Sequence, residues 1–236
     1  DKLKREEVME FRFSFDHIEE WIEKSLVTIK RKENKDIFES SINDYKTTIA
    51  LIESLNIKFE DSPILYLSYT STYFRSNYYI KFTPVNSDTK KFNDFYGAAR
   101  KFNEFIEILS NVPISFTNIE FLVQDVLIDK NHIPLIKGKF FVQHARKYKK
   151  WNKSSQKNIS LSKLDTNFEQ ILNHWFDKTE ELEFIVKQFS KNLHGDLYLE
   201  DQLVDAIRNL EVYSRNFKLD ENGKTRKMIL SERLKE

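Results

Sequence analysis

Hydrophobic and polar residues alternate along the first half of the chain, with the period of two that is typical of half-buried β-strands. Phe11, Phe13 and Phe15 point to one side of such a strand, whereas Arg12 and Ser14 point to the other. Comparable runs, rich in β-branched and aromatic residues, predict further strands. These runs are residues 26–29, 45–51, 64–73, 78–82, 119–128 and 135–144.

Two helices are expected to interrupt this sheet. Asp16 is the predicted N-cap of a short one. Its apolar face consists of Ile18, Trp21 and Ile22. A longer helix is expected over residues 92–109, because its apolar residues follow each other in steps of three and four. They are Phe92, Phe95, Ala99, Phe102, Ile106 and Leu109. Asp88 or Thr89 is the predicted cap, and Pro113 prevents the helix from continuing.

Beyond residue 164 the period changes to that of amphipathic helices. Thr166 and Glu169 have the spacing of a capping box at the start of a first helix. A second helix is expected over about residues 179–193, with Gly195 at the position just past its end. A third helix is expected to begin at Asp196. Its stripe consists of Leu199, Leu203, Ile207, Leu210, Tyr213 (or Ser214) and Phe217.

The two periods together predict an α+β protein of unequal parts. Residues 1–148 are expected to form a β-rich N-terminal domain with one covering helix. Residues 149–164 have the composition of a polar, basic linker, and residues 165–236 begin an all-α segment. A hydrophobic fraction of 40%, with 20 Phe, 10 Tyr and 3 Trp, suffices for a real core and excludes disorder of the whole chain.

Composition also bounds the environment of the protein. The absence of cysteine excludes disulfides and thiolate metal ligands and fits a reducing compartment. The first residues lack the apolar run of a signal peptide, and no stretch approaches the ~20 apolar residues of a membrane-spanning helix. We therefore expect a cytoplasmic protein without a membrane partner. The chain begins without Met and its last residues continue a helical pattern, so we expect it to be a piece of a longer protein.

The net charge of +1 hides a segregation of charge. Residues 130–164 contain ten Lys or Arg and no acid, whereas residues 165–211 contain eleven acids and four bases. Within the basic stretch, cations alternate with rings that can stack on unpaired bases, which makes this stretch a candidate RNA-binding segment. The candidate residues are Arg146, Lys147, Tyr148, Lys149, Lys150 and Trp151. The alternative is a solvated strand end and linker whose lysines discourage edge pairing.

Other catalytic signatures are missing from the sequence. The five histidines show no H-E-x-x-H or comparable metal spacing, so no metal site is expected. With four glycines in all, there is no G-x-G-x-x-G, no Walker pattern and no G-x-S-x-G elbow. We expect no cofactor.

The sequence of the third predicted helix resembles a pattern of a known family. Residues 203–215 read Leu-Val-Asp-Ala-Ile-Arg-Asn-Leu-Glu-Val-Tyr-Ser-Arg. This run resembles a helix of the ApeA-like HEPN family of bacterial anti-phage proteins, whose pattern is F-L-x-L-v-q-A-L-E-x-Y-H-R. Leu203 stands where that pattern has Phe, and Ser214 where it has His. Residues 15–21, 87–113 and 168–175 are similar to further elements of the family, in the same order.

The resemblance implies a metal-independent endoribonuclease that acts in abortive infection. HEPN nucleases cut RNA with an Arg-x(4–6)-His pair, in which His transfers a proton and Arg stabilises phosphorane charge, usually across a dimer. One match exists here, Arg12 to His17, and its place in the β-rich part makes it a chance match. The functional pair is expected beyond residue 236, so this chain alone is predicted to be inactive.

The same resemblance suggests two supporting residues. Glu211 and Arg215 match polar positions of the family's helix and are candidates for orienting the catalytic pair. The alternative for both is a solvated helix face.

The sequence therefore favours a part of an ApeA-like HEPN ribonuclease. Its N-terminal domain would be a sensor or regulator, and its expected partners are RNA, a phage-derived trigger protein and a second copy bound through the helical part. The alternative is a non-catalytic recognition or scaffold module that binds a phage protein or peptide.

Overall fold

The chain forms two compact units in a computed structural model, which describes residues 7–24, 27–32, 35–40, 45–67, 74–86, 89–124, 135–142, 159–195 and 198–217. The boundary between the units lies between Phe176 and Asp177. The first unit contains an antiparallel sheet with helices, and the described part of the second unit is helical. The predicted α+β class is confirmed.

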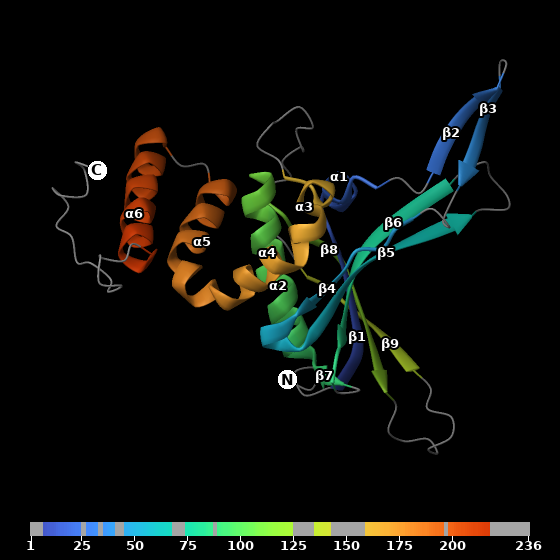
Figure 1. Ribbon diagram of the computed structural model, residues 1–236, viewed down its shortest axis with the longest axis horizontal. Coiled ribbons are helices and arrows are strands. Elements are labelled where there is room, and N and C mark those ends of the chain that lie inside the picture. Colours follow the sequence, from blue (N-terminus) through green and yellow to red (C-terminus); the bar gives the residue numbers. More distant parts are fainter. Residues whose placement is uncertain are drawn as a thin grey trace. The chain divides into compact units, whose positions relative to one another are not determined.

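The sheet of the first unit is antiparallel and has seven described strands (Figure 1). Their order is β4 (Ile49–Ile52), β5 (Ile57–Leu67), β6 (Phe74–Pro84), β1 (Glu7–Phe15), β8 (Phe116–Gln124) and β9 (Leu135–Phe140), with the short β7 (Lys90–Lys91) also paired to β1. The first strand of the chain therefore lies in the middle of the sheet. A separate hairpin is formed by β2 (Val27–Lys32) and β3 (Lys35–Ser40).

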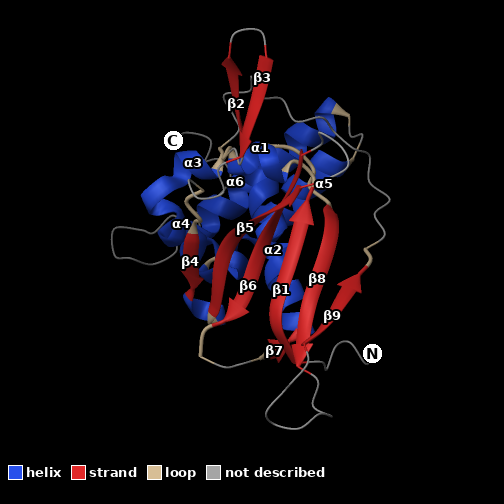
Figure 2. Cartoon of the chain, turned by 90° about the vertical axis from the view of Figure 1, so that its right-hand side faces the viewer, coloured by secondary structure: helices blue, strands red, loops and turns tan. Residues whose placement is uncertain are grey.

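Helix α2 (Phe92–Ser110) lies behind the sheet in the view of Figure 2. The other helical elements of the first unit are α1 (Ile18–Ile22), α3 (Leu161–Leu164), α4 (Phe168–Asp177) and the 3₁₀ turns η3 (Glu53–Leu55) and η4 (Asp165–Asn167). The second unit contains α5 (Thr179–His194) and α6 (Leu199–Phe217).

An aromatic core joins the sheet to α2. The three alternating phenylalanines of β1 are buried, as the period of two predicts. The rings of Phe11 and Phe95 stack at 5.8 Å, and those of Phe13 and Phe102 meet edge to face at 5.9 Å. Such pairs add about 0.5–1.5 kcal/mol each beyond the area that they bury. The predicted stripe of α2 is thus confirmed as its sheet-facing side.

The N-caps predicted for α1 and α2 are wrong. The N-cap of α2 is Lys91, without a side-chain cap, whereas the Thr89 hydroxyl donates to Glu7 Oε2 at 2.9 Å. Pairing of β7 with β1 keeps the chain extended up to Lys91, so the helix begins later than a cap at 89 requires. Asp88 lies outside the described residues. The N-cap of α1 is His17 rather than Asp16.

The first compact unit extends to Phe176. Residues 159–164 were expected to belong to a linker and residue 165 to begin the helical part, yet both belong to the first unit. Leu161, Leu164 and Phe168 are buried, and the backbone N–H of Ile159 donates to Leu109 O at 2.9 Å. The apolar face of these residues completes the core of the β-rich unit. Residues 149–158 lie outside the described residues.

The second unit confirms the two later helices. The predicted second helix at 179–193 corresponds to α5, and Gly195 is its C-cap, with φ −99° rather than the left-handed conformation. The predicted apolar stripe lies on α6, where its described side chains are largely exposed. Leu199 is 78% exposed and Leu210 is 69% exposed.

Candidate functional site

The face of the sheet away from the phenylalanine core carries charged and polar side chains. One row crosses the strands through Glu60, Lys81, Arg12, Glu120 and Lys139, each in register with the next. Lys81 Nζ lies 2.6 Å from Glu60 Oε1, and Lys139 Nζ lies 3.5 Å from Glu120 Oε1. Because the row contains both acids and bases, and several of them pair, it is not a uniform anion-binding surface.

Glu120 is the most buried charge in that row, at 5% exposure. Burial raises its pKa, but hydrogen bonds from Lys137 and Asn118 and the charges of Lys137 and Lys139 outweigh burial, so the pKa lies below its ordinary value. Lys137 Nζ is 2.6 Å from Glu120 Oε2. Glu120 therefore stays ionised at neutral pH and holds β9 to β8.

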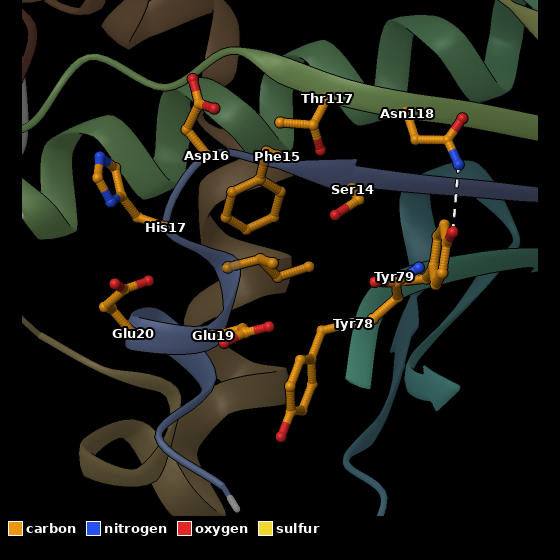
Figure 3. Close-up of a pocket in the computed structure, with 12 residues that line it drawn as sticks. Ser14, Phe15, Asp16, His17, Glu19, Glu20, Tyr78, Tyr79, Thr117 and Asn118 are labelled. Carbon is orange, nitrogen blue, oxygen red and sulfur yellow. Dashed lines mark hydrogen bonds between the residues drawn. The ribbon is translucent and has the colours of Figure 1, made fainter. Parts of the chain in front are cut away.

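A cavity of about 420 Å³ opens where β1 ends (Figure 3). Its wall comes from the end of β1 and the start of α1, from β6 and from the start of β8. The lining residues with polar side chains are Ser14, Asp16, His17, Glu19, Glu20, Asn77, Tyr78, Tyr79, Thr117 and Asn118. Its size falls in the range of about 300–1,000 Å³ that is usual for small-ligand sites.

The backbone at this cavity is locally strained. His17 has φ 66°, in the left-handed region, and its side chain is 8% exposed. Asp16 N donates to Ser115 O at 2.9 Å, which ties the turn after β1 to the segment before β8. Strained residues of this kind persist only where surrounding contacts hold them. The turn therefore gives the cavity a fixed rim.

A second polar cluster, on the core side of the sheet, surrounds the fully buried Asp61 of β5. Lys24 Nζ lies 2.7 Å from its Oδ2, and the Tyr45 hydroxyl donates to the same oxygen at 2.9 Å. Thr48 N donates to Asp61 Oδ1 at 2.6 Å. Burial, and secondly the Asp61 charge, raise the pKa of Tyr45, so its hydroxyl keeps its proton. This cluster ties the segment before β4 to the sheet.

The contact between α5 and α6 is polar, in contrast to the exposed stripe. Asp205 is 4% exposed, and its carboxylate lies 3.5 Å from Lys191 Nζ and 3.9 Å from Arg208 Nη1. Leu203 is 61% exposed and Ile207 is 48% exposed. Within the described residues of this unit, a polar side chain of α6 contacts α5, and the apolar stripe of α6 is largely exposed.

The structure describes only some of the residues predicted as functional. Residues 146–151 lie outside the described residues, and of Arg215 the structure gives only its place on α6. Glu211 lies on α6 and is partly buried. Arg12 Nε lies 2.5 Å from Glu10 Oε1, whereas His17 lines the cavity.

Sequence reasoning missed the cavity. Its only local signal is the run Asp16-His17-Ile18-Glu19-Glu20, because the lining residues outside 14–20 come from strands far apart in the sequence. Among the residues that the structure describes, no group of three or more His, Asp or Glu side chains is placed to hold a metal ion. No helix in the described ranges is long and apolar enough to cross a membrane.

A known protein family matches the first compact unit of the chain. The family model described as ApeA N-terminal domain 1 matches residues 1–175, which is the first compact unit almost residue for residue. The match covers well over half of the chain, which therefore belongs to the ApeA N-terminal domain family. ApeA-like proteins act in antiviral defence. No curated protein and no solved structure matches the chain.

Proposed function

We propose that this chain is part of an ApeA-like HEPN ribonuclease. The ribonuclease acts in the cytoplasm of a bacterium and defends the cell against phage by abortive infection. In this proposal the first unit senses a phage-derived trigger protein or holds the nuclease inactive. Helices α5 and α6 begin the nuclease domain. The metal-independent Arg-x(4–6)-His pair comes from residues outside 1–236, and Glu211 and Arg215 help to orient it.

The observation that carries the proposal is the apolar stripe of α6, on the helix that resembles the family's HEPN pattern. Its exposed residues include Leu199, Leu203, Ile207 and Leu210. A contiguous apolar helix face of this kind marks a surface that packs against another structural element. Further helices of the nuclease domain and the stripe of a second copy both fit this face, which supports a homodimer through the helical part.

RNA is the proposed substrate, and the basic segment at 146–151 is its proposed contact outside the catalytic pair. Lysines and arginines there neutralise phosphates, and Tyr148 and Trp151 stack on bases. The charged row on the sheet does not compete with this segment for RNA, because its cations are paired with Glu10, Glu60 and Glu120.

The cavity at the end of β1 favours a second candidate function. A non-catalytic recognition or scaffold module needs a shaped site for a protein or peptide, and this cavity offers one without any nuclease residue. The nuclease candidate requires a catalytic segment beyond residue 236 and cleavage of RNA, whereas the recognition module requires neither.

The test is to read the coding sequence beyond residue 236 and to assay its full product on labelled tRNA and total RNA, with and without Mg²⁺. The proposal predicts a helical Arg-x(4–6)-His segment and cleavage that is independent of metal and disappears when this His is replaced by Ala. A reading frame that stops at residue 236, or a product that leaves RNA intact, contradicts it and favours the recognition module.

A further inference from the structure

The β2–β3 hairpin extends away from the other elements of the first unit (Figures 1 and 2). Among the described strands, β2 and β3 pair only with each other. A two-stranded hairpin is marginally stable on its own in water, so its root needs support from the rest of the fold. The segments on both sides of the hairpin supply this support.

The root of the hairpin is pinned to the sheet by the polar cluster around Asp61. Lys24 lies before the hairpin, and Tyr45 and Lys46 lie after it. Lys24 Nζ donates to Lys46 O at 2.7 Å and lies 5.0 Å from the centre of the Tyr45 ring. Lys24 and Tyr45 both bond to the buried carboxylate of Asp61 on β5. The hairpin is therefore an arm with an anchored root.

Three lysines share one face of this arm, at the end distant from its root. Lys30 and Lys32 are two residues apart on β2, and Lys32 is in register with Lys35 on β3. Positions two residues apart on one strand, and positions directly opposite on paired strands, lie on the same face of a sheet. Arg31 is in register with Asp36, and this pair of opposite charges lies on the other face. We call Lys30, Lys32 and Lys35 the lysine face.

The lysine face carries an energetic cost for the hairpin. Lys32 and Lys35 are directly opposite each other, and like charges at such positions destabilise a pair of strands. Lys30 adds a third positive charge roughly 7 Å along the same face. Its opposite residue is Ile37, so no acidic residue is in register with any of the three lysines. A bound polyanion removes this repulsion, and an arm that extends from its unit can reach a long polymer.

We propose that the lysine face binds the phosphate backbone of RNA without regard to base sequence. This inference rests on the proposed function, in which RNA is the substrate, and adds a contact in the first unit to the one at residues 146–151. Lysine contacts to phosphates position an RNA and carry no base information. Residues 30–35 contain no aromatic residue, so this contact lacks the stacking that favours unpaired bases. Single-stranded and duplex RNA should therefore both use it.

The test is fluorescence anisotropy of labelled single-stranded and duplex RNA with the 236-residue chain, between about 50 and 200 mM salt. The variant combines Lys30→Gln, Lys32→Gln and Lys35→Gln. On a single strand it should lower the slope of log K against log salt by roughly 2, at about 0.7 per lost contact. Over this range the parent should lose roughly twentyfold more affinity than the variant. The slope should decrease on duplex RNA as well.

Two further variants separate a phosphate contact from other effects. The first replaces each lysine of the lysine face by arginine, which keeps the charge and should keep the slope. The second removes the same charge elsewhere and should leave the slope nearly unchanged. It combines three exposed positions, Lys91→Gln, Lys178→Gln and Lys187→Gln. Because the glutamine variant of the lysine face relieves the repulsion between opposite lysines, it should unfold at no lower urea concentration than the parent.

An unchanged slope with the glutamine variant of the lysine face, or an equal decrease with the control variant, contradicts the inference. If Lys147→Gln, Lys149→Gln and Lys150→Gln together still lower the slope, the contact at residues 146–151 stands and only the lysine face is ruled out. None of these results depends on RNA cleavage.

NMR of the isotope-labelled parent keeps the test decisive if a variant misfolds. Added RNA should shift the amide signals of residues 27–40, and the absence of these shifts at low salt contradicts the inference. Shifts with poly-glutamate but not with RNA also contradict it, and assign the lysine face to an acidic protein partner.

Discussion

Replacing Phe168 by Ala tests whether α4 belongs to the core of the first unit. The side chain of Phe168 is 2% exposed, and its ring lies 5.0 Å from that of Phe59 on β5 and 6.3 Å from that of Trp21. Removing the ring leaves a cavity between α4 and the sheet. Core Phe→Ala substitutions cost about 3–5 kcal/mol, and the close ring contacts here support a loss in that range.

The loss is measured by urea unfolding of the whole chain, followed by tryptophan fluorescence. With a slope of about 2–3 kcal/mol per molar urea, the midpoint should fall by roughly 1–2 M. Gln170→Ala, an exposed position on the same helix, is the matched control and should stay within about 0.5 kcal/mol of the parent.

A small effect would refute this reasoning. If Phe168→Ala costs less than about 1 kcal/mol and resembles Gln170→Ala, then α4 contributes little to the core. The boundary between the parts would then lie in residues 149–164, where the sequence alone placed it.

Three further predictions concern charges and the exposed stripe. Asp61→Asn should destabilise the first unit by about 3 kcal/mol in urea unfolding, because it breaks a buried charge pair. Lys137→Gln should raise the pKa of Glu120 in an NMR titration. Folding lowers the pKa of Glu120, so the ionised carboxylate stabilises the parent protein at a pH above the pKa of Glu120 in the unfolded chain. This stabilisation is lost as the pH falls through the pKa of Glu120 in the folded protein. In the variant the folded pKa is higher, so the stabilisation should be lost at a higher pH. Leu203→Glu should abolish self-association in analytical ultracentrifugation, whereas Gln202→Glu in the same turn should not.

The local pattern of polar and apolar residues was sufficient to predict an element where that element is regular over several residues. The alternation in β1 and the stripe of α2 predicted both elements and their buried faces, because burial follows the period of the element. The pattern also located α5 and α6. For α6 the pattern predicted which apolar residues share one face of the helix. It did not predict that this face is exposed, because exposure depends on what packs against the helix.

Contacts between distant residues explain the errors. Residues 45–48 resemble a strand, but Tyr45 and Thr48 bond to Asp61 and β4 begins only at Ile49. Glu169 was expected in a capping box with Thr166, yet its Oε1 accepts from Leu51 N on the edge strand β4 at 2.8 Å. Such partners lie far apart in the chain, and no local pattern identifies them.

For the same reason, the sequence did not predict the cavity or the packing of residues 159–176. The carboxylates near His17 form a short acidic run in the sequence. Asn77 and Asn118 line the same cavity only because their strands pair within the sheet. Residues 159–176 look like a linker and a new domain until their apolar side chains are seen to meet Trp21 and Phe59.

The central claim is that this protein acts on RNA. The most direct test is to measure RNA binding by the 236-residue chain across a salt series. Fluorescence anisotropy with a short labelled RNA should give binding whose log K falls linearly with log salt. Replacing Lys147, Lys149 and Lys150 by Gln should lower that slope by roughly 0.7 per lost phosphate contact, for all sequences alike. Trp151→Ala should cost about 1–3 kcal/mol with little change in slope. No binding at low salt, where electrostatic attraction is strongest, would contradict the account.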